Sequence, residues 1–577
     1  MATTGGSGRV SGAWGRWIRE RRVAVGLGLG AGRRALASLP TWPGRLRVRL
    51  GASRAPAIVL VPQDLRTTDP VRADELAAGI FTFAGRTVEA ADPFTITPPS
   101  EDWAEALATF SWLRHLRASG TPEAAEAGRR LVVAWIAAEG RRHPAGRTDT
   151  VAAERIRAFI GASGLLLSGA DQVFYRRFAR ALWRQVRDLE ARLPRVPPGK
   201  DRLSVLIALV TAALCMSGEE KLLAKASRLL GEELQAQILP DGCHVSRHPG
   251  IIVGLILDLL PLRQLFPARN ATPPATIVTA VDRMMPMIRF FQLGDGSLGR
   301  FNGMGPTPID QVATALVYDD TRGTAPLSAS HGGYERLEAG PAIVLVDAGA
   351  APPARYSGEA HAGCLSFEFS AGRDPIVVNC GVPPIIKAAW RTDARKTAAH
   401  STVSVANRSS MRIGTGIWSE GLVVSGTGPV TRERRGQSLV ARHDGYRSRL
   451  GVVHVRRLDL AATGDRLAGE DRIEGADQPY VLRFHLHPGV EVIPTEHPQA
   501  ALLRLPGGDG WRFVADQSVA IEESVALAQA EGPRRALQIV VAVASSAAIP
   551  AVTWAFQRLE RPQKRAEPLP EPELPLG

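Results

Sequence analysis

The stretch EAHAGCLSFEFS, residues 359–370, decides the fold, because a polar cluster in it runs directly into an alternating strand. From Leu365 onward every second side chain is apolar, so the apolar residues share one face of a sheet and the polar residues the other. A second polar cluster, residues 391–400, also leads into a strand, at residues 402–406. Both clusters contain histidine, and together the two strand beginnings predict one site for a charged sugar.

The alternation continues through the C-terminal half of the chain. From about Ser328 to Phe556, short runs with a period of two are separated by Gly, Asp and Asn, a pattern typical of an antiparallel β-sandwich. The clearest predicted strands are residues 343–346, 365–369, 376–378, 402–405, 452–455, 481–486 and 537–543.

The N-terminal half has a different period. Between about residues 101 and 291, apolar residues recur at helical spacing, with short polar breaks between the helical runs. Successive helical hairpins predict an all-α domain that closes into a ring or bends into an arc. The predicted domains are a flexible Gly/Arg-rich N-terminus (1–55), a helical domain (56–325), a β-sandwich (326–560) and a disordered tail (561–577).

The chain has 577 residues and a formal net charge of +13, supplied mostly by arginine. An arginine-rich coding bias and a polyanionic partner both explain this charge. The sequence contains no zinc-finger spacing, RNA-binding signature or long basic arm, which argues against nucleic acid as the partner. The four cysteines form no CxxC pair, so we expect them to be buried apolar residues and not zinc ligands.

The N-terminus is a poor signal peptide, because its apolar run, residues 23–32, is rich in glycine and ends at Arg33 and Arg34. No segment is expected to reach the length of a membrane span. The sequence also lacks a phosphate-binding P-loop, a dinucleotide fingerprint, a GxSxG elbow and an HExxH motif. Several common enzyme classes therefore have no motif to support them.

One loop contains several candidate catalytic or binding residues close together. PDGCHVSRHPG, residues 240–250, places His244, Ser246, Arg247 and His248 within five positions. In one interpretation this is a polar loop whose side chains cap the next helix. In the other it forms one wall of a substrate cleft, where the arginine binds a carboxylate and a histidine transfers a proton.

Other polar segments offer weaker signals. GDGSLGRFNG, residues 294–303, is either a turn or a glycine-rich cleft loop that brings Asp295 and Asn302 to a ligand. The histidines of HDGY (443–446) and HLHP (485–488) are more typical of hydrogen-bonded structural residues.

His361, Asn379 and His400 all lie beside predicted strands. They would either converge on a metal ion or orient a sugar directly. Asparagine is a weaker zinc ligand than aspartate, which leaves both alternatives open.

In combination, these segments resemble the heparinase II/III-like polysaccharide lyases. EAHAGCLSFEFS, IVVNCG and RKTAAHSTVSV follow one another in the order of that family's HGHxDxLSFEL-like, IVDSG-like and RSTxxHNTV-like strands. The PDG, HDGY and HLHP segments also match, and the resemblance extends from about Asp92 to Val543. It implies an incomplete (α/α) toroid followed by an antiparallel β-sandwich, and cleavage of a uronate-containing polysaccharide by β-elimination.

The resemblance also implies roles for single positions. His361, Asn379 and His400 match three positions that hold a largely structural zinc ion in some members. Glu359 stands where the family has a catalytic-type histidine, and Ile251 stands where it has a catalytic-type tyrosine.

Two further departures concern the helical domain. Within PDGCHVSRHPG, Ser246 takes the position of a glutamate and His248 that of a serine. An upstream Asn-His pair is also absent, and residues 200–203 stand near its place. The chain keeps the family's frame while replacing much of its proton-transfer set.

The leading hypothesis is a divergent lyase that cleaves an anionic polysaccharide, in which His244 or His248 is the base, Arg247 binds the carboxylate, and Glu359 or His400 assists. No cofactor is required, and a structural Zn²⁺ is an option. The predicted catalytic residues are His244, His248, Glu359 and His400; the substrate-binding residues Arg247, Ser246, Asp295, Asn302, Arg391 and Arg395; and the metal ligands His361, Asn379 and His400.

Two alternatives stay open. The first is a non-catalytic polysaccharide-binding or envelope-assembly protein on the same scaffold. The second is a hydrolase that uses a carboxylate pair such as Glu359 and Asp295. The family implies the cell envelope or periplasm, whereas the weak signal peptide leaves the cytoplasm open. The oligomeric state is not predicted.

Overall fold

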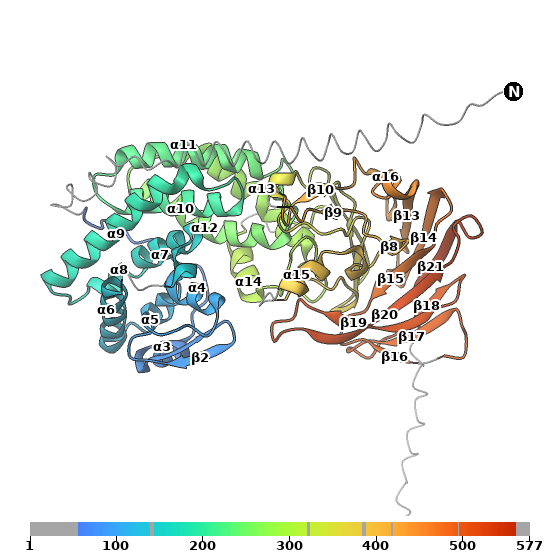
Figure 1. Cartoon of the computed structure of the whole chain (residues 1–577), viewed down its shortest axis with the longest axis horizontal. Coiled ribbons are helices and arrows are strands. Elements are labelled where there is room, and N and C mark those ends of the chain that lie inside the picture. The colour runs from blue at the N-terminus through green and yellow to red at the C-terminus, as the bar shows by residue number, and fades with distance from the viewer. Residues whose placement is uncertain are drawn as a thin grey trace, which may run out of the picture.

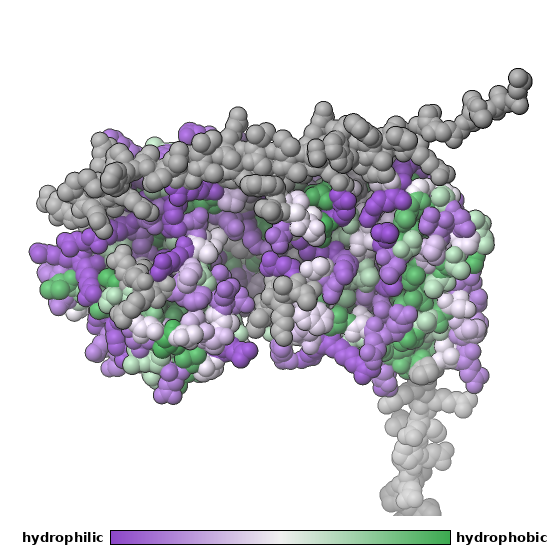
Figure 2. Space-filling view, viewed as in Figure 1, coloured by the Kyte–Doolittle hydropathy of each residue, from purple (hydrophilic) through white to green (hydrophobic). Residues whose placement is uncertain are grey.

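The computed structural model describes residues 56–138, 143–319, 323–383, 388–416, 419–493 and 495–560. The predictions for residues 1–55 and 561–577, including the signal peptide, lie outside these residues. Helices gather at one end of the molecule and strands at the other (Figure 1). The visible face mixes hydrophilic and hydrophobic residues, and hydrophobic side chains gather over the strands, at the end of the molecule away from the helices (Figure 2).

The N-terminal part is helical, with one small hairpin, as the spacing of apolar residues predicted. Side chains of Thr121, Thr148 and Asp171 accept hydrogen bonds from the first turns of their helices, which fixes where those helices begin. The elements are α3 (Pro70–Ala78), β1 (Ile80–Phe83), β2 (Arg86–Glu89), α4 (Glu101–Thr109), α5 (Leu113–Ser119), α6 (Pro122–Ala137), α7 (Asp149–Gly161), α8 (Ser163–Leu167), α9 (Gln172–Arg192), α10 (Lys200–Cys215), α11 (Glu220–Gln237), α12 (Pro249–Ala268), α13 (Ala275–Phe291) and α14 (Ile309–Val317).

Helices α10 and α12 are apolar on most sides because they lie inside the helical part, and α10 packs against α7, α11 and α12. Within the described residues, α12 alone is long and apolar enough to cross a membrane by length and composition. The sequence reading had not anticipated such a segment. Most of this helix is buried among its neighbours, as in the core helix of a soluble domain.

The C-terminal part consists of antiparallel sheets, and the predicted β-sandwich is confirmed. The main sheets have the strand orders β3-β4-β5-β6-β7, β19-β20-β15-β8 and β11-β12-β13-β14-β21-β18-β17-β16, and β9 and β10 form a small separate pair. The strands are β3 (Ser328–Ala329), β4 (Tyr334–Ala339), β5 (Ala342–Asp347), β6 (Phe367–Ala371), β7 (Asp374–Val377), β8 (Val403–Val405), β9 (Arg412–Ile413), β10 (Val423–Ser425), β11 (Thr431–Arg435), β12 (Ser438–His443), β13 (Val452–Leu460), β14 (Arg466–Gly475), β15 (Tyr480–His485), β16 (Glu491–Ile493), β17 (Ala500–Arg504), β18 (Gly510–Ala515), β19 (Ala520–Ala526), β20 (Arg534–Val543) and β21 (Ala551–Arg558), with short helices α15 (Ala388–Ala394) and α16 (Arg447–Leu450) between them.

Aromatic side chains join the three sheets. Phe367 of β6 stacks on Trp554 of β21 with ring centroids 5.5 Å apart, and Phe484 of β15 lies 4.8 Å from the same tryptophan. Each sheet therefore contributes an inward aromatic residue to one core. A separate contact, between Phe291 of α13 and Tyr334 of β4 at 5.0 Å, continues the helical core into the five-stranded sheet.

The alternating stretch that decided the fold is shorter as a strand than predicted. β6 begins at Phe367, because Leu365 has a left-handed backbone with φ of 60°. Phe367 and Phe369 enter the core as expected. Glu368 on the other face is also buried, where it accepts hydrogen bonds from the backbone N–H groups of Arg300 and Asn379.

Candidate functional site

Arg247 joins the helical part to the sheets. It lies in the loop between α11 and α12 with φ of 64°, and its side chain is 6% exposed. All five guanidinium N–H donors have acceptors in the sheet part of the chain. These acceptors are the carbonyl oxygens of Gly332 (2.7 Å), Gly333 (3.1 Å), Gly349 (3.4 Å) and Ala350 (3.1 Å) and the carboxylate of Asp347 (2.5 Å).

His244 and Ser246 are occupied within their own loop. His244 Nε2 lies 2.9 Å from Gln237 Oε1, so it carries the ring proton, and Nδ1 lies 2.7 Å from Ser246 Oγ. Burial lowers the pKa of His244 to about 3. The ring is therefore neutral at physiological pH, and neither nitrogen is free to accept a proton from a substrate.

Lys200, His248 and Glu359 come together where the two parts meet. Lys200 Nζ lies 2.6 Å from Glu359 Oε1, and His248 Nε2 lies 3.9 Å from Glu359 Oε2. The side chains of Lys200 and Glu359 are 50% and 35% exposed, so solvent reaches the ion pair. We call Lys200, His248 and Glu359 the seam cluster.

The charges of the seam cluster are fixed by its surroundings. Burial would raise the pKa of Glu359, but the charge and hydrogen bond of Lys200, together with His248 and Arg391, outweigh burial, and the net effect is a lowered pKa. Burial lowers the pKa of His248 to about 4, although Glu359 partly opposes this shift. His248 Nδ1 accepts a hydrogen bond from Gly250 N at 3.0 Å, which caps α12 and leaves the ring proton on Nε2. At neutral pH the seam cluster is thus a Lys–Glu ion pair beside a neutral histidine.

The loop at residues 294–303 touches the seam cluster through Gly303. With φ of 85°, this glycine packs so closely that an added Cβ would lie 2.8 Å from Glu359 Cβ. Asn302 is buried one residue earlier, where Nδ2 donates to Tyr334 Oη at 2.7 Å and Oδ1 accepts from His361 N at 3.0 Å. Asn302 therefore braces the loop and is not exposed to a ligand.

Asp295, from the same loop, faces elsewhere. Its Oδ1 accepts hydrogen bonds from the backbone N and the hydroxyl of Ser297, and the neighbouring Gly294 N donates to Ser370 Oγ of β6. Among the residues that the structure describes, Asp295 and Glu359 make no direct contact.

His361 and His400 belong to one linear series of hydrogen bonds, which runs from Gly303 N to Lys396 O. His361 Nε2 accepts from Gly303 N at 3.1 Å, so its proton is on Nδ1, which donates to His400 Nε2 at 3.1 Å. His400 Nδ1 in turn donates to Lys396 O at 2.8 Å. Burial lowers the pKa of His400 to about 4 and that of His361 well below 6.5, so both rings are neutral.

The same geometry tests the predicted zinc site. Asn379 Oδ1 accepts from Ser401 N at 2.9 Å, and its buried Nδ2 has no hydrogen-bond partner. An amide N–H₂ does not ligate zinc, and both histidines already use their lone pairs on protein donors. In the described part of the chain, no group of three or more His, Cys, Asp or Glu could hold a metal ion. As they lie, His361, Asn379 and His400 do not fit a zinc ion.

The two predicted substrate-binding arginines differ in their surroundings. Arg395 is buried, and its Nε and Nη2 donate to Ala360 O (2.8 Å) and Ser357 O (3.0 Å), which fixes the backbone on either side of Glu359. Arg391 is exposed on α15, and its charge contributes to the lowered pKa of Glu359.

His443, His454 and His485 are buried, hydrogen-bonded residues. His454 Nε2 lies 2.7 Å from the buried Asp471, and His443 lies against His454. His485 bonds Ser524 Oγ at 2.7 Å and Ala398 O at 2.9 Å. All four cysteines are free and buried.

Of the predicted site residues, the structure brings His248 and Glu359 together at a place that solvent reaches. Arg391 lies near enough for its charge to affect the pKa of Glu359. Sequence reasoning assigned no role to Lys200, which completes the seam cluster. Lys200 lies near the position where the family has an Asn-His pair, and this was the sequence feature that could have pointed to it. Ile251, in the position of the family's tyrosine, offers no hydroxyl group.

Comparisons with known proteins agree with this architecture. The family model for the heparinase II/III-like C-terminal region matches residues 321–555. The chain is 30% identical to FtsZ-localized protein C of Caulobacter vibrioides over 498 residues, which is 82% of this chain and 85% of that protein.

Solved structures share the fold at low sequence identity. A crystal structure of heparinase III superposes with a TM-score of 0.67 at 14% identity, covering 90% of this chain and 89% of that one. Heparan sulfate lyase HepC from Pedobacter heparinus superposes with a TM-score of 0.58 at 15% identity, covering 89% and 87%. The chain belongs to the heparinase II/III-like family.

Proposed function

We propose that this protein is a non-catalytic member of its family, which binds partners during assembly of the division apparatus or the cell envelope and does not cleave polysaccharide. The observation that carries the proposal is the ion pair between Lys200 and Glu359. It lies at the position where the family has a catalytic-type histidine, while Ile251 replaces the catalytic-type tyrosine.

The chemistry of β-elimination supports the same proposal. The reaction needs one group that accepts the C5 proton of the uronate and one that protonates the leaving O4. His244 and His400 have both ring nitrogens hydrogen-bonded, and His248 has Nδ1 engaged in the cap of α12. Arg247 has no free N–H for the uronate carboxylate. Arg247 instead joins the helical part to the sheets.

The name of the relative supports a role in division. FtsZ-localized protein C is similar to this chain over most of both lengths, and its name places that protein with FtsZ. We therefore propose FtsZ, or a component of an FtsZ assembly, as a partner of this chain. Co-sedimentation of the purified chain with FtsZ polymers tests the partner. Saturable co-sedimentation is expected, and recovery of the chain only in the supernatant would contradict it.

A divergent lyase is the second candidate, and one observation favours it. The seam cluster lies where solvent reaches it, and the charge of Arg391 acts on Glu359. Lys200 and Arg391 are cations that suit a uronate carboxylate. An assay for the unsaturated uronate product separates the candidates. The non-catalytic proposal expects no product from any anionic polysaccharide.

A further inference from the structure

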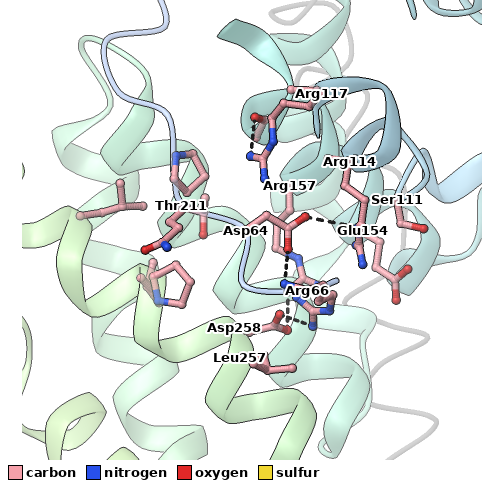
Figure 3. A pocket seen from close by; sticks show the side chains of 18 of the residues that line it. Asp64, Arg66, Ser111, Arg114, Arg117, Glu154, Arg157, Thr211, Leu257 and Asp258 are labelled. Carbon is pink, nitrogen blue, oxygen red and sulfur yellow. Dashed lines mark hydrogen bonds and ion pairs between the residues drawn. The ribbon is translucent and has the colours of Figure 1, made fainter. Parts of the chain in front are cut away.

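The helical part contains a cavity of about 280 Å³ that plays no role in the proposed function (Figure 3). Its walls come from α5, α7, α10, α12, α14 and the segment before α3. Four arginines line it: Arg66, Arg114, Arg117 and Arg157. This volume is close to the lower end of small-molecule sites in proteins, which begin at about 300 Å³.

The cavity is separate from the seam cluster. Lys200 begins α10 and His248 caps α12, so both helices start at the seam. Thr211 of α10 and Asp258 of α12 line the cavity. At 1.5 Å per residue, these positions lie roughly 15 Å further along their helices. The cavity therefore lies away from the seam cluster, farther along both helices.

Two acids neutralise three of the arginines. Asp258 is shared between Arg66, at 2.6 Å, and Arg157. Burial would raise the pKa of Asp258, but the two arginines outweigh burial and lower it to about 2. Asp64 Oδ2 lies 3.3 Å from Arg114 Nε, without the geometry of a hydrogen bond. A third acid, Glu154, also lines the cavity and interacts electrostatically with Arg66 and Arg114. The four arginines of the cavity therefore share three carboxylates.

The wall formed by α5 has surplus positive charge. Arg114 and Arg117 are three residues apart, so they lie on one face of the helix, one turn from Ser111. Arg117 Nη1 donates to Gly161 O at 3.1 Å and, among the described residues, forms no ion pair. Burial, together with repulsion from Arg66 and Arg157, lowers the pKa of Arg114. An added anion would relieve this repulsion.

Apart from Asp258, the wall formed by α12 is apolar. Leu257, Pro261, Leu262 and Leu265 line the cavity from this helix. We propose that the cavity binds a small organic oxyanion, whose carboxylate or phosphate group lies at Arg114 and Arg117 and whose apolar body lies against α12. Guanidinium groups bind both kinds of oxyanion through paired, charge-assisted hydrogen bonds.

Isothermal titration calorimetry on the full chain tests the proposal with benzoate, phenyl phosphate and inorganic phosphate. We expect benzoate or phenyl phosphate to bind saturably at one per chain, and more tightly than inorganic phosphate. Preference for phenyl phosphate would identify a phosphate-bearing ligand, and preference for benzoate a carboxylate. Failure of both to bind, or equal binding of inorganic phosphate, would overturn the proposal.

Two variants locate the binding. Arg117→Ala should weaken binding about tenfold or more, the loss typical of removing one charge-assisted contact. Arg129→Ala is the matched control, because Arg129 also donates Nη1 to a helix-end carbonyl, Ser168 O, at 3.1 Å but lies outside the cavity. Ala158→Leu should also weaken binding, because it fills the cavity without changing its charge. Equal affinities in Arg117→Ala and Arg129→Ala would contradict the assignment.

Discussion

The hydroxyl group of Tyr334 donates a hydrogen bond to the carbonyl oxygen of Arg247 at 2.6 Å, and its ring lies 4.6 Å from the guanidinium group of the same arginine. Tyr334, in β4 of the five-stranded sheet, thus contacts both the backbone and the side chain of Arg247, a loop residue of the helical part. The left-handed backbone of Arg247 is stabilised by these contacts. This pair is the centre of the join between the two parts.

Replacement of Arg247 should destabilise the whole chain. Arg247→Ala leaves Asp347 buried without its partner, and loss of one member of a buried ion pair costs about 3–5 kcal/mol. Chemical denaturation measures the change in the free energy of unfolding. Arg457→Ala, which removes an exposed pair with Asp459, is the control and should leave stability nearly unchanged. Equal stability of the two variants would show that Arg247 does not hold the parts together.

A second prediction concerns the contact between Gly303 and the seam cluster. Gly303→Ala should cost clearly more than Gly508→Ala, although the two glycines have nearly the same φ, 85° and 86°. Gly508 has open space around its Cβ position, so its replacement costs only the left-handed strain of about 1–2 kcal/mol. Gly303 adds a clash with Glu359 at 2.8 Å. Matching melting temperatures would mean that the loop does not pack on Glu359.

Buried neutral histidines predict acid sensitivity. The pKa values of His244 and His248 fall from 6.5 to about 3 and about 4 in the folded chain. Below pH 6.5 the unfolded chain binds protons that the folded chain does not, so stability is full above this value and falls from pH 6.5 toward pH 4. Each such histidine contributes at most about 1.4 kcal/mol per pH unit.

Unfolding free energies across this pH range check the prediction. His244→Gln should reduce the slope of stability against pH, because one proton fewer is taken up on unfolding. The exposed His497→Gln is the control for the loss of a histidine. A slope that is identical in wild type and His244→Gln would contradict the burial of His244.

Asn379 decides the metal chemistry. Asn379→Asp should create a zinc site with His361 and His400, because the aspartate would keep the acceptor for Ser401 N and replace the unpartnered amide nitrogen with an oxygen ligand. The zinc ion would then displace the hydrogen bond between the two histidine rings. Metal analysis after zinc loading and desalting is expected to find one zinc per chain in the variant and none in the wild type. Stoichiometric zinc in the wild type, lost in His400→Ala, would contradict the fit of these residues described above.

The fold could be predicted from local patterns. The apolar runs at residues 343–346 and 537–543 become the largely buried strands β5 and β20, and the helical spacing in the N-terminal half reflects buried helix faces. A sequence records both patterns directly. The family resemblance then brought Glu359 and the residue 240–250 loop to one seam. His248 and Glu359 do meet there.

The hydrogen-bond partners and protonation states of the site residues could not be predicted from local patterns. From the sequence alone, Arg247 is interpreted as a substrate-binding residue. Its actual hydrogen-bond acceptors lie 85 to 103 residues away in the sequence, so no local pattern could reveal them. His244 is neutral because of burial and Gln237, which no local pattern shows. Lys200 lies 159 residues from Glu359, so only the folded chain reveals their ion pair.

The rate at which unsaturated uronate forms is the most direct test of the central claim. Wild type and Lys200→Ala are incubated with heparan sulfate, chondroitin and alginate, beside heparinase III as a positive control, and ultraviolet absorbance is followed. The account predicts no rise above the protein-free control for either form of this chain. A rise proportional to the concentration of wild type, and lost in Lys200→Ala, would contradict it.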